Sequence, residues 1–175
     1  MYRYFGKRLF DIVLCVVVSI PCLCLLVTAC LVVLLGDGRP IFFVQTRLGL
    51  NGKEFQIFKV RTLKKEVSMK TPINNTEQWD GFVRFGRTLR IYGIDEIPQL
   101  INVVKGDMSF VGPRPLLTEY RQKYTEEQWR RHFVKPGLTG IAQISTQNVS
   151  KWYESLELDL EYERNVSFGR DLKII

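Results

Sequence analysis

The sequence predicts a mostly helical α+β fold, with an N-terminal re-entrant membrane helix-break-helix, a β-hairpin, and amphipathic interfacial helices around a small core. Residues 12–35 contain no charged side chain, which is typical of a membrane segment. Asn51-Gly52 stands between two apolar runs, a pattern typical of a hairpin. Farther along the chain, apolar residues recur at helical spacing. We therefore divide the chain into a membrane part with its flanks, residues 1–38, and a cytoplasmic domain, residues 39–175.

The apolar run could cross a bilayer, because its 24 residues exceed the roughly 20 that a spanning helix needs. Two features instead favour a segment that enters the membrane and turns back. Pro21 stands in the middle of the run, where it removes a backbone donor and bends a helix. Positive residues, which prefer the cytoplasmic side, flank both ends of the run: Arg3, Lys7 and Arg8 before it, and Arg39, Arg47 and Lys53 after it. The fully spanning alternative stays open.

A cleaved signal peptide is disfavoured, because its apolar core is shorter than this run. Asp11 stands at the edge of the run, where a carboxylate is costly unless it is paired. Arg8 lies one helical turn earlier and is its expected partner. All 4 cysteines fall inside the apolar run, where we expect them to act as small apolar residues. The absence of cysteine elsewhere suits a domain that faces the cytosol.

The formal net charge of +7 indicates a basic surface. Such a surface can meet nucleic acid, anionic lipid or phosphorylated small molecules. Beside a membrane segment, lipid headgroups and phosphate substrates are the better expectation. The sequence has no zinc-finger spacing, RNP-type motif or recognition-helix signature, so no nucleic-acid partner is expected. A basic face that is simply solvated remains the alternative.

The rest of the chain is predicted to form short helices and strands separated by turns. Residues 82–91 and 95–104 have helical spacing, with Gly106 expected to end the second helix. Residues 116–133 carry aromatic side chains at intervals that suit one longer amphipathic helix. The full set of expected elements is strands at 41–45, 54–60 and 141–144, helices at 82–91, 95–104, 116–133 and 152–163, and an exposed loop at 64–80.

Asp95-Glu96 is an adjacent pair of carboxylates in front of Ile97-Pro98, at the start of a predicted helix. Taken alone, the pair is well suited to capping, since Asp favours the N-cap and Glu the first turn. The same helix end offers free N–H groups that suit a phosphate. Carboxylate oxygens and substrate phosphates are also the ligands that Mg²⁺ prefers. Asp95 is therefore a candidate Mg²⁺ ligand, with helix capping as the alternative.

Cationic side chains gather on both sides of this pair in the sequence. Lys59 and Arg61 alternate at the end of a predicted strand, so they point to the same face. An arginine row, three residues apart, shares one face of the predicted helix at 82–91. Arg114 stands between two prolines, which restrict its backbone and leave a guanidinium suited to bidentate phosphate binding. The candidate phosphate contacts are Lys59, Arg61, Arg87, Arg90 and Arg114, with Arg84 completing the row.

Five motifs occur together and in this order: Lys7-Arg8-Leu9-Phe10-Asp11, Lys59-Val60-Arg61-Thr62, Asp95-Glu96-Ile97-Pro98-Gln99-Leu100, the run from Lys105 to Pro115, and Lys135-Pro136-Gly137-Leu138-Thr139-Gly140. With these motifs the chain resembles the bacterial sugar transferase family, the small monotopic phosphoglycosyl transferases. The resemblance covers essentially the whole chain. It implies transfer of a sugar 1-phosphate from a UDP-sugar to undecaprenyl phosphate, with release of UMP and a requirement for Mg²⁺.

The resemblance also implies roles for individual residues. Asp95 is implied to be the nucleophile that forms a covalent aspartyl-phosphosugar intermediate, and Glu96 to belong to the same catalytic dyad. The family's re-entrant membrane helix, broken near a proline, matches the interpretation of Pro21. The domain at 39–175 is thus expected to be a catalytic domain on the cytoplasmic face of the bacterial inner membrane.

The expected partners are a UDP-sugar, undecaprenyl phosphate and inner-membrane lipid, with homo-oligomers or association with downstream glycosyltransferases as a further expectation. The expected role is the first membrane step of capsule, exopolysaccharide, O-antigen or glycoprotein assembly, with the pathway and the sugar left open. The chain departs from the family pattern at Val60, at Leu63 and in residues 141–148, so no sugar-specific contact is carried over from that last segment. A non-catalytic scaffold that uses the same basic surface is the alternative function. A membrane-tethered nucleic-acid-binding protein is a further alternative, for which the net charge is the only evidence.

Overall fold

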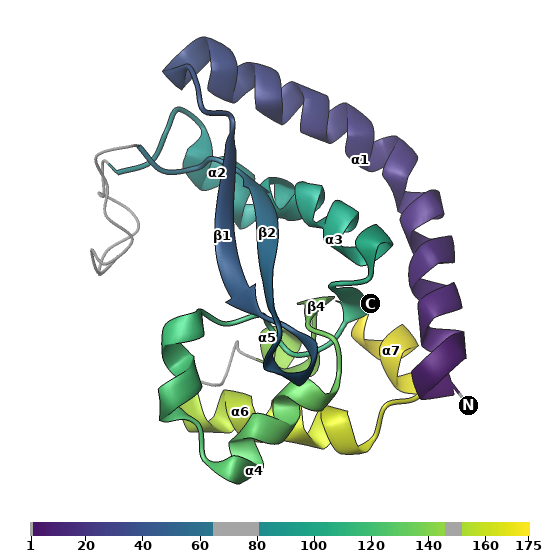
Figure 1. Ribbon diagram of the computed structural model, residues 1–175. Coiled ribbons are helices and arrows are strands. Elements are labelled where there is room, and N and C mark those ends of the chain that lie inside the picture. The colour runs from purple at the N-terminus through teal and green to yellow at the C-terminus, as the bar shows by residue number, and fades with distance from the viewer. Residues whose placement is uncertain (1, 65–80, 146–151) are drawn as a thin grey trace. The chain divides into compact units, whose positions relative to one another are not determined.

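The structure is a computed structural model, which describes residues 2–64, 81–145 and 152–175. Figure 1 shows a mostly helical molecule with little β-structure, as the sequence predicts. Its contacts divide the chain into two compact units. Unit 1 comprises Met1–Val17, Gln45–Ile57 and Leu100–Ile175, and unit 2 comprises Val18–Val44 and Phe58–Gln99. Most of the predicted loop at 64–80 lies outside the described residues.

The N-terminal element is a π-helical turn, η1 (Tyr2–Gly6), followed by the long helix α1 (Lys7–Asp37). Within the described chain, α1 alone is long and apolar enough to cross a membrane, by length and composition. The predicted break at Pro21 is not found, because α1 stays helical through that residue. One missing N–H removes a single bond of the ladder, which the remaining turns of a long helix can tolerate. The re-entrant path remains a prediction.

Strands β1 (Phe42–Leu48) and β2 (Glu54–Val60) pair in a two-stranded sheet, close to the predicted ranges. A single 3-10 turn, η2 (Leu50–Gly52), joins them. The sequence places Asn51 and Gly52 in this turn, and both adopt positive φ angles, 54° and 72°. Asn and Gly tolerate this conformation best, which explains why the turn forms at this point.

Unit 1 contains a second, parallel pair of strands that the sequence reading did not predict. β3 (Ser109–Val111) pairs with β4 (Gly137–Thr139), with Ser109 opposite Gly137. A Cβ atom on Gly137 would collide with the backbone nitrogen of Gly112, so the close approach needs glycine. The strand predicted at 141–144 is wrong, since those residues form helix α5 (Ile141–Ser145) directly after β4.

The single helix predicted at 116–133 is also wrong. The segment folds as η4 (Thr118–Lys123), α4 (Glu126–Trp129) and η5 (Arg130–Phe133). Thr125 forms a capping box with Gln128 and starts a new helix in the middle of the segment. The predicted helix at 152–163 is confirmed as α6 (Trp152–Arg164), whereas α7 (Phe168–Ile174) was not predicted.

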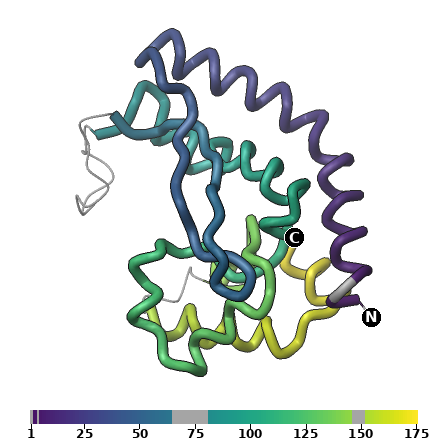
Figure 2. The backbone as a smooth tube through the Cα atoms, in the orientation of Figure 1, coloured from purple at the N-terminus to yellow at the C-terminus, as the bar shows by residue number. Residues whose placement is uncertain are grey.

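The core of unit 1 ties the start of α1 to α7, which lies beside it in Figures 1 and 2. Lys7 Nζ donates to Asp171 Oδ2 at 2.6 Å and to Tyr162 Oη at 2.9 Å. Tyr2 Oη donates to the same carboxylate at 2.6 Å. Asp171 is fully buried, so these charge-assisted bonds compensate for its lost hydration.

Asp11 is buried as well, but its predicted partner is wrong. Its Oδ1 accepts hydrogen bonds from Ser109 Oγ at 2.8 Å and from the Phe110 backbone N–H at 3.0 Å. Arg8 instead donates to the backbone oxygens of Val103 and Val104, at 2.5 and 2.6 Å. Arg8 thereby satisfies carbonyls at the end of α3 (Leu100–Lys105), where cations are favourable.

Unit 2 has its own small core, formed by buried side chains of α1, β2 and the segment around α2 (Gly86–Ile91): Ala29, Val33, Val60, Val83 and Leu89. The helix predicted at 82–91 begins four residues late, because Phe85 has a φ angle of 61° that a helix cannot include. The helix predicted at 95–104 is present in two parts, η3 (Ile94–Gln99) and then α3, and Gly106 follows it with a φ angle of 91°.

Candidate active site

Asp95 lies at the start of η3 in unit 2 and is almost completely buried, with 3% of its surface exposed. Gly93 turns the chain just before it with a φ angle of 66°. Asp95 Oδ1 has no hydrogen-bond partner among the described residues. A buried carboxylate oxygen without a partner is unfavourable, and this is the kind of strain that functional sites retain. The carboxyl group does accept a hydrogen bond from the backbone N–H of Asp95 itself, so a local capping role stays the alternative.

Burial raises the pKa of Asp95 above the usual range of a carboxyl group. Lys59 opposes this shift, Glu96 adds to it through like charge, and Arg90 again lowers the pKa. The site therefore combines a poorly solvated carboxyl group with two cations that favour its ionised form. A carboxylate in such a setting is a more reactive nucleophile than a hydrated one.

Lys59 and Glu96 form an ion pair, in which Lys59 Nζ donates to Glu96 Oε1 at 2.5 Å. Lys59 comes from β2 and Glu96 from η3, so the tertiary fold brings together two residues that the sequence reading assigned to one site. The side chains are 18% and 26% exposed, which places the pair at the edge of the buried site. The ion pair fixes the position of the Lys59 ammonium, whose positive charge acts on Asp95.

The predicted arginine row is only partly helical. Arg87 and Arg90 lie on α2 and are exposed, and the guanidinium of Arg90 lies 5.8 Å from the centre of the Phe82 ring. Arg84 precedes the helix, and its backbone N–H donates to Asp37 Oδ2 at 2.7 Å. Two of the three arginines are thus exposed on the helix that contacts η3.

Arg61 is buried, with 7% of its surface exposed. Its Nη2 donates to the backbone oxygens of Asp37 and Gly38, at 3.0 and 2.9 Å. The guanidinium therefore satisfies carbonyls at the C-terminus of α1. Arg61 therefore has a structural role as a cap of α1. The alternation of Lys59 and Arg61 in the sequence did not predict this role.

Arg114 belongs to unit 1, unlike the other predicted site residues. It is exposed, and its backbone oxygen accepts a 2.8 Å hydrogen bond from Arg131 Nη2. Arg114 also lines a cavity of about 450 Å³ together with Trp152 and Asp159. Arg131 forms a buried ion pair with Asp159 at 2.7 Å, so two side chains 28 residues apart hold the backbone of Arg114 in place. No local signal in the sequence predicts this pair.

The donor set for a metal ion is small. No group of three or more His, Cys, Asp or Glu side chains clusters anywhere in residues 2–64, 81–145 and 152–175. Asp95 has an unpartnered oxygen, and one oxygen of Glu96 is engaged by Lys59. This set fits Mg²⁺ bound by one or two carboxylates, since that ion commonly keeps water and substrate phosphates as its other ligands.

A buried carboxyl group beside cations is compatible with group-transfer chemistry, and sequence comparison specifies the family. The sequence model of the bacterial sugar transferase family matches residues 2–175. The chain belongs to the bacterial sugar transferase family, and it is a transferase.

Curated relatives match nearly the whole chain. An uncharacterized sugar transferase, EpsL of Bacillus subtilis (strain 168), is 46% identical over 169 residues, which are 97% of this chain and 83% of the relative. A UDP-glucose:undecaprenyl-phosphate glucose-1-phosphate transferase of Caulobacter vibrioides is 38% identical over 97% of this chain and 66% of its own length. The protein of the same description in Escherichia coli (strain K12) is 38% identical over 97% of this chain and 38% of its own length. The chain thus spans only part of these two glucose-1-phosphate transferases.

Proposed function

We propose that the protein transfers a sugar 1-phosphate from a UDP-sugar to undecaprenyl phosphate and releases UMP, with Asp95 as the nucleophile. The observation that most directly supports this proposal is the buried Oδ1 of Asp95, which has no hydrogen-bond partner among the described residues and lies beside the Lys59–Glu96 ion pair. The descriptions of the Caulobacter and Escherichia relatives, which name undecaprenyl phosphate as the acceptor, support the same reaction class.

The reaction takes place in two displacements at one phosphorus atom. In the first, an Asp95 carboxylate oxygen attacks the phosphorus that bears the sugar, and the bond from that phosphorus to the bridging oxygen breaks. UMP leaves with the bridging oxygen and the electron pair, and the sugar phosphate is bound to Asp95 as an acyl phosphate. In the second, a phosphate oxygen of undecaprenyl phosphate attacks the same phosphorus, the acyl phosphate bond breaks, and the Asp95 carboxylate is restored.

The neighbouring side chains stabilise charge during both steps. Lys59 holds Glu96 and keeps a positive charge beside Asp95, which favours the ionised nucleophile. Arg87 and Arg90 are exposed on α2 and can bind the phosphates of the incoming substrate. Fixed cations in a poorly hydrated site stabilise a transferring phosphoryl group more strongly than the same charges would in water.

Asp95, with Glu96, would hold Mg²⁺ in this proposal. The unpartnered Asp95 oxygen supports this assignment, since it offers an acceptor that the described protein does not use. When bound, the ion would neutralise phosphate charge and make the UMP phosphate a better leaving group. The remaining ligands would be phosphate oxygens and water.

The test uses the purified full chain with a panel of UDP-sugars, undecaprenyl phosphate and Mg²⁺, and measures UMP release. We expect one UDP-sugar to yield UMP, and Asp95→Asn to abolish the release. Glu157→Gln, which removes an exposed carboxylate of α6, is the matched control and should retain full activity. Activity of Asp95→Asn equal to the wild type would disprove the nucleophile assignment.

A second measurement tests the covalent intermediate. The enzyme is incubated with the active UDP-sugar in the absence of acceptor, and its peptides are then analysed by mass spectrometry. We expect a sugar phosphate on the peptide that contains Asp95, which disappears when undecaprenyl phosphate is added. If no UDP-sugar yields UMP and Asp95→Ala leaves glycan assembly intact, the non-catalytic scaffold is the correct alternative.

We further propose that α1 is a re-entrant helix and that the enzyme acts at the cytoplasmic face of the inner membrane. The length and apolar composition of α1 support membrane association. Undecaprenyl phosphate is a membrane lipid, whereas a UDP-sugar is soluble, so a transferase must meet both at a membrane surface. The sugar that the enzyme accepts, once identified by the UMP-release assay, would indicate which glycan pathway uses the product.

A further inference from the structure

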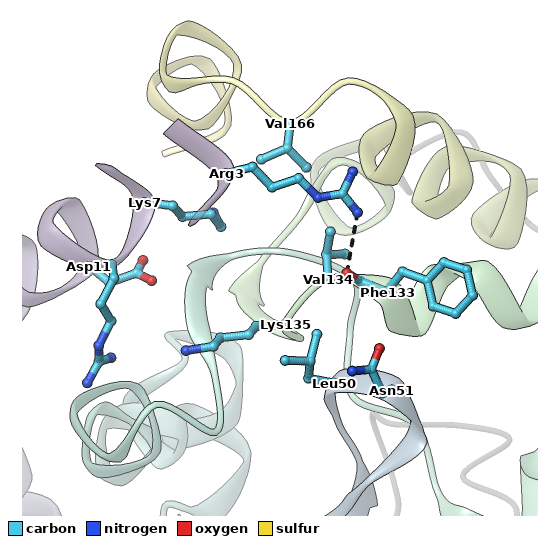
Figure 3. Close-up of a pocket in the computed structure, with 10 residues that line it drawn as sticks. Arg3, Lys7, Asp11, Leu50, Asn51, Phe133, Val134, Lys135 and Val166 are labelled. Carbon is cyan, nitrogen blue, oxygen red and sulfur yellow. Dashed lines mark hydrogen bonds between the residues drawn. The ribbon is translucent and has the colours of Figure 1, made fainter. Parts of the chain in front are cut away.

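A basic cavity lies in unit 1, at the start of α1 (Figure 3). Its volume is about 330 Å³, enough for a phosphate group with several waters. Four cationic side chains and one carboxylate line it, namely Arg3, Lys7, Arg8, Lys135 and Asp11. None of these residues has a part in the proposed transfer reaction.

Two of the four cations are neutralised by carboxylates of the same unit. Arg3 pairs with Glu163 at 2.8 Å, and Lys7 pairs with Asp171 at 2.6 Å. Asp11 accepts its hydrogen bonds from Ser109 and Phe110. These donors are neutral, so Asp11 offsets one of the two remaining cations, Arg8 and Lys135, and the cavity keeps one net positive charge.

Lys135 Nζ has no hydrogen-bond or ion-pair partner in the part of the chain that the structure describes. The side chain is half-buried and extends across the cavity toward Asp11 (Figure 3). Burial and the charge of Arg8 lower the pKa of this amine below its ordinary value. Asp11 and Asp107 oppose this shift through their negative charge, but neither forms an ion pair with the amine among the described residues. The ammonium therefore keeps room to bind an anion.

Arg8 and Lys135 converge over Gly106. A Cβ atom at Gly106 would lie 3.5 Å from Lys135 Nζ and 3.6 Å from Arg8 Nη2. The guanidinium of Arg8 is bound to carbonyls of α3, so its position is fixed. A fixed guanidinium and a free ammonium that meet at one point form a preorganised pair of donors for an anion with several oxygens.

The turn η1 and the start of α1 also present apolar side chains to the outside. Phe5, Leu9, Val13 and Val16 recur at helical spacing and are 80%, 67%, 52% and 65% exposed. Phe133, which lines the cavity, is 47% exposed. A phosphate that carries hydrocarbon could therefore place its charge in the cavity and its chain against this apolar surface.

We propose that this cavity binds a phosphate group between Lys135 and Arg8, supplied by an anionic membrane lipid or by a phosphate anion in solution. The two sources share the chemistry that the donors recognise. The exposed apolar face of α1 favours the lipid, because only a lipid gains from contact with it.

The binding test uses the full chain in neutral detergent without any UDP-sugar. Native mass spectrometry measures the binding of phosphatidylglycerol and of phosphatidylcholine, and a second arm adds inorganic phosphate as a competitor. We expect phosphatidylglycerol to bind and phosphatidylcholine not to bind. Lys135→Gln should weaken phosphatidylglycerol binding by about ten- to a hundredfold, as expected for the loss of one charged hydrogen bond.

Three further variants control the result. Lys173→Gln removes an exposed lysine of unit 1 outside the cavity and should bind the lipid as the wild type does. Lys135→Arg restores a cation and should restore binding. Asp95→Asn should bind normally, so a failure of the transfer reaction is separable from a failure of this site. In the absence of ligand, Lys135→Gln should melt at the same temperature as the wild type or higher, because the charge it removes is unfavourable there.

The two arms separate the sources of the phosphate. If phosphatidylglycerol binds with higher affinity than inorganic phosphate, the cavity is a lipid site. If the two probes bind with equal affinity and Lys135→Gln weakens both, the cavity is a site for soluble phosphate. Equal loss of lipid binding in Lys135→Gln and Lys173→Gln would show general charge attraction and overturn the proposal. Absence of binding by both probes would overturn it as well.

Discussion

At the scale of the single residue, Lys59 has the most direct influence on the proposed nucleophile. Lys59→Gln leaves Glu96 without its ion-pair partner and removes a cation that favours ionised Asp95. We expect UMP release at saturating substrate to fall by about ten- to a hundredfold, as for the loss of a charged hydrogen bond. Lys53→Gln, at an exposed lysine of the turn between β1 and β2, should leave the rate unchanged. Equal rates for the two variants would contradict this role of Lys59.

His132 should make stability depend on pH. Burial and the neighbouring Arg131 lower its pKa to about 4 from 6.5. Its Nε2 has no hydrogen-bond partner within the described residues. Between these two pKa values the unfolded chain binds a proton that the folded chain excludes. Stability conferred by neutral His132 is therefore complete above pH 6.5 and is lost as the pH falls toward 4.

The measurement is thermal unfolding of the wild type and of His132→Gln in detergent at pH 8 and pH 5. Between these conditions the wild type should lose roughly 2 kcal/mol of stability through His132 alone. His132→Gln should be less stable at pH 8 but should change less between the two pH values. Parallel losses in both proteins would show that His132 is not the titrating group.

At the scale of the element, Arg61 connects β2 to the end of α1. Arg61→Met removes the two hydrogen bonds to the Asp37 and Gly38 carbonyls and should cost about 2–3 kcal/mol of folding stability. Arg87→Gln, on the exposed face of α2, should leave stability unchanged and raise KM for the UDP-sugar. The measurements are the melting temperature and the KM for the UDP-sugar of both variants. A lowered melting temperature indicates a helix cap, and a raised KM indicates a phosphate contact. A stable Arg61→Met with a raised KM would instead support the phosphate contact predicted from the sequence.

The elements that sequence reasoning predicted are those whose causes are local. The turn at Asn51-Gly52 and the amphipathic helix α6 each depend on neighbouring residues. The errors have distant or competing causes. β4 forms because it pairs with β3, in which Ser109 lies 28 residues before its partner Gly137, and Gly137 permits the close approach of the two backbones. The expected helix at 116–133 fails because Thr125 caps a new helix within it.

The same contrast holds for the candidate site. Asp95, Glu96 and Lys59 were found from motifs, and the fold brings Lys59 and Glu96 together as an ion pair. The partners of Asp11, at Ser109 and Phe110, lie about 100 residues away and could not be predicted from spacing. Lys135 was noted within a motif, but its unpartnered amine becomes visible only once the cavity is known.

At the scale of the whole molecule, the connections between the two units bear on the membrane topology. The chain passes from one unit to the other within α1, within β1, within β2, and between Gln99 and Leu100. Two of these connections lie within strands that pair with each other, so the sheet contains residues of both units. A two-stranded sheet leaves open edges, whose backbone groups would lack partners in hydrocarbon. We therefore expect the sheet to lie outside the bilayer, as the re-entrant path that we propose also requires.

Cysteine labelling tests this topology with a matched pair of positions. Phe5→Cys and Arg39→Cys place thiols at exposed sites just before and just after α1, in a chain whose 4 native cysteines are replaced by alanine. A membrane-impermeant maleimide should label neither position in intact cells and both after permeabilisation, because both ends of α1 face the cytoplasm in the re-entrant path that we propose. Labelling of one position alone in intact cells would mean that α1 spans the membrane.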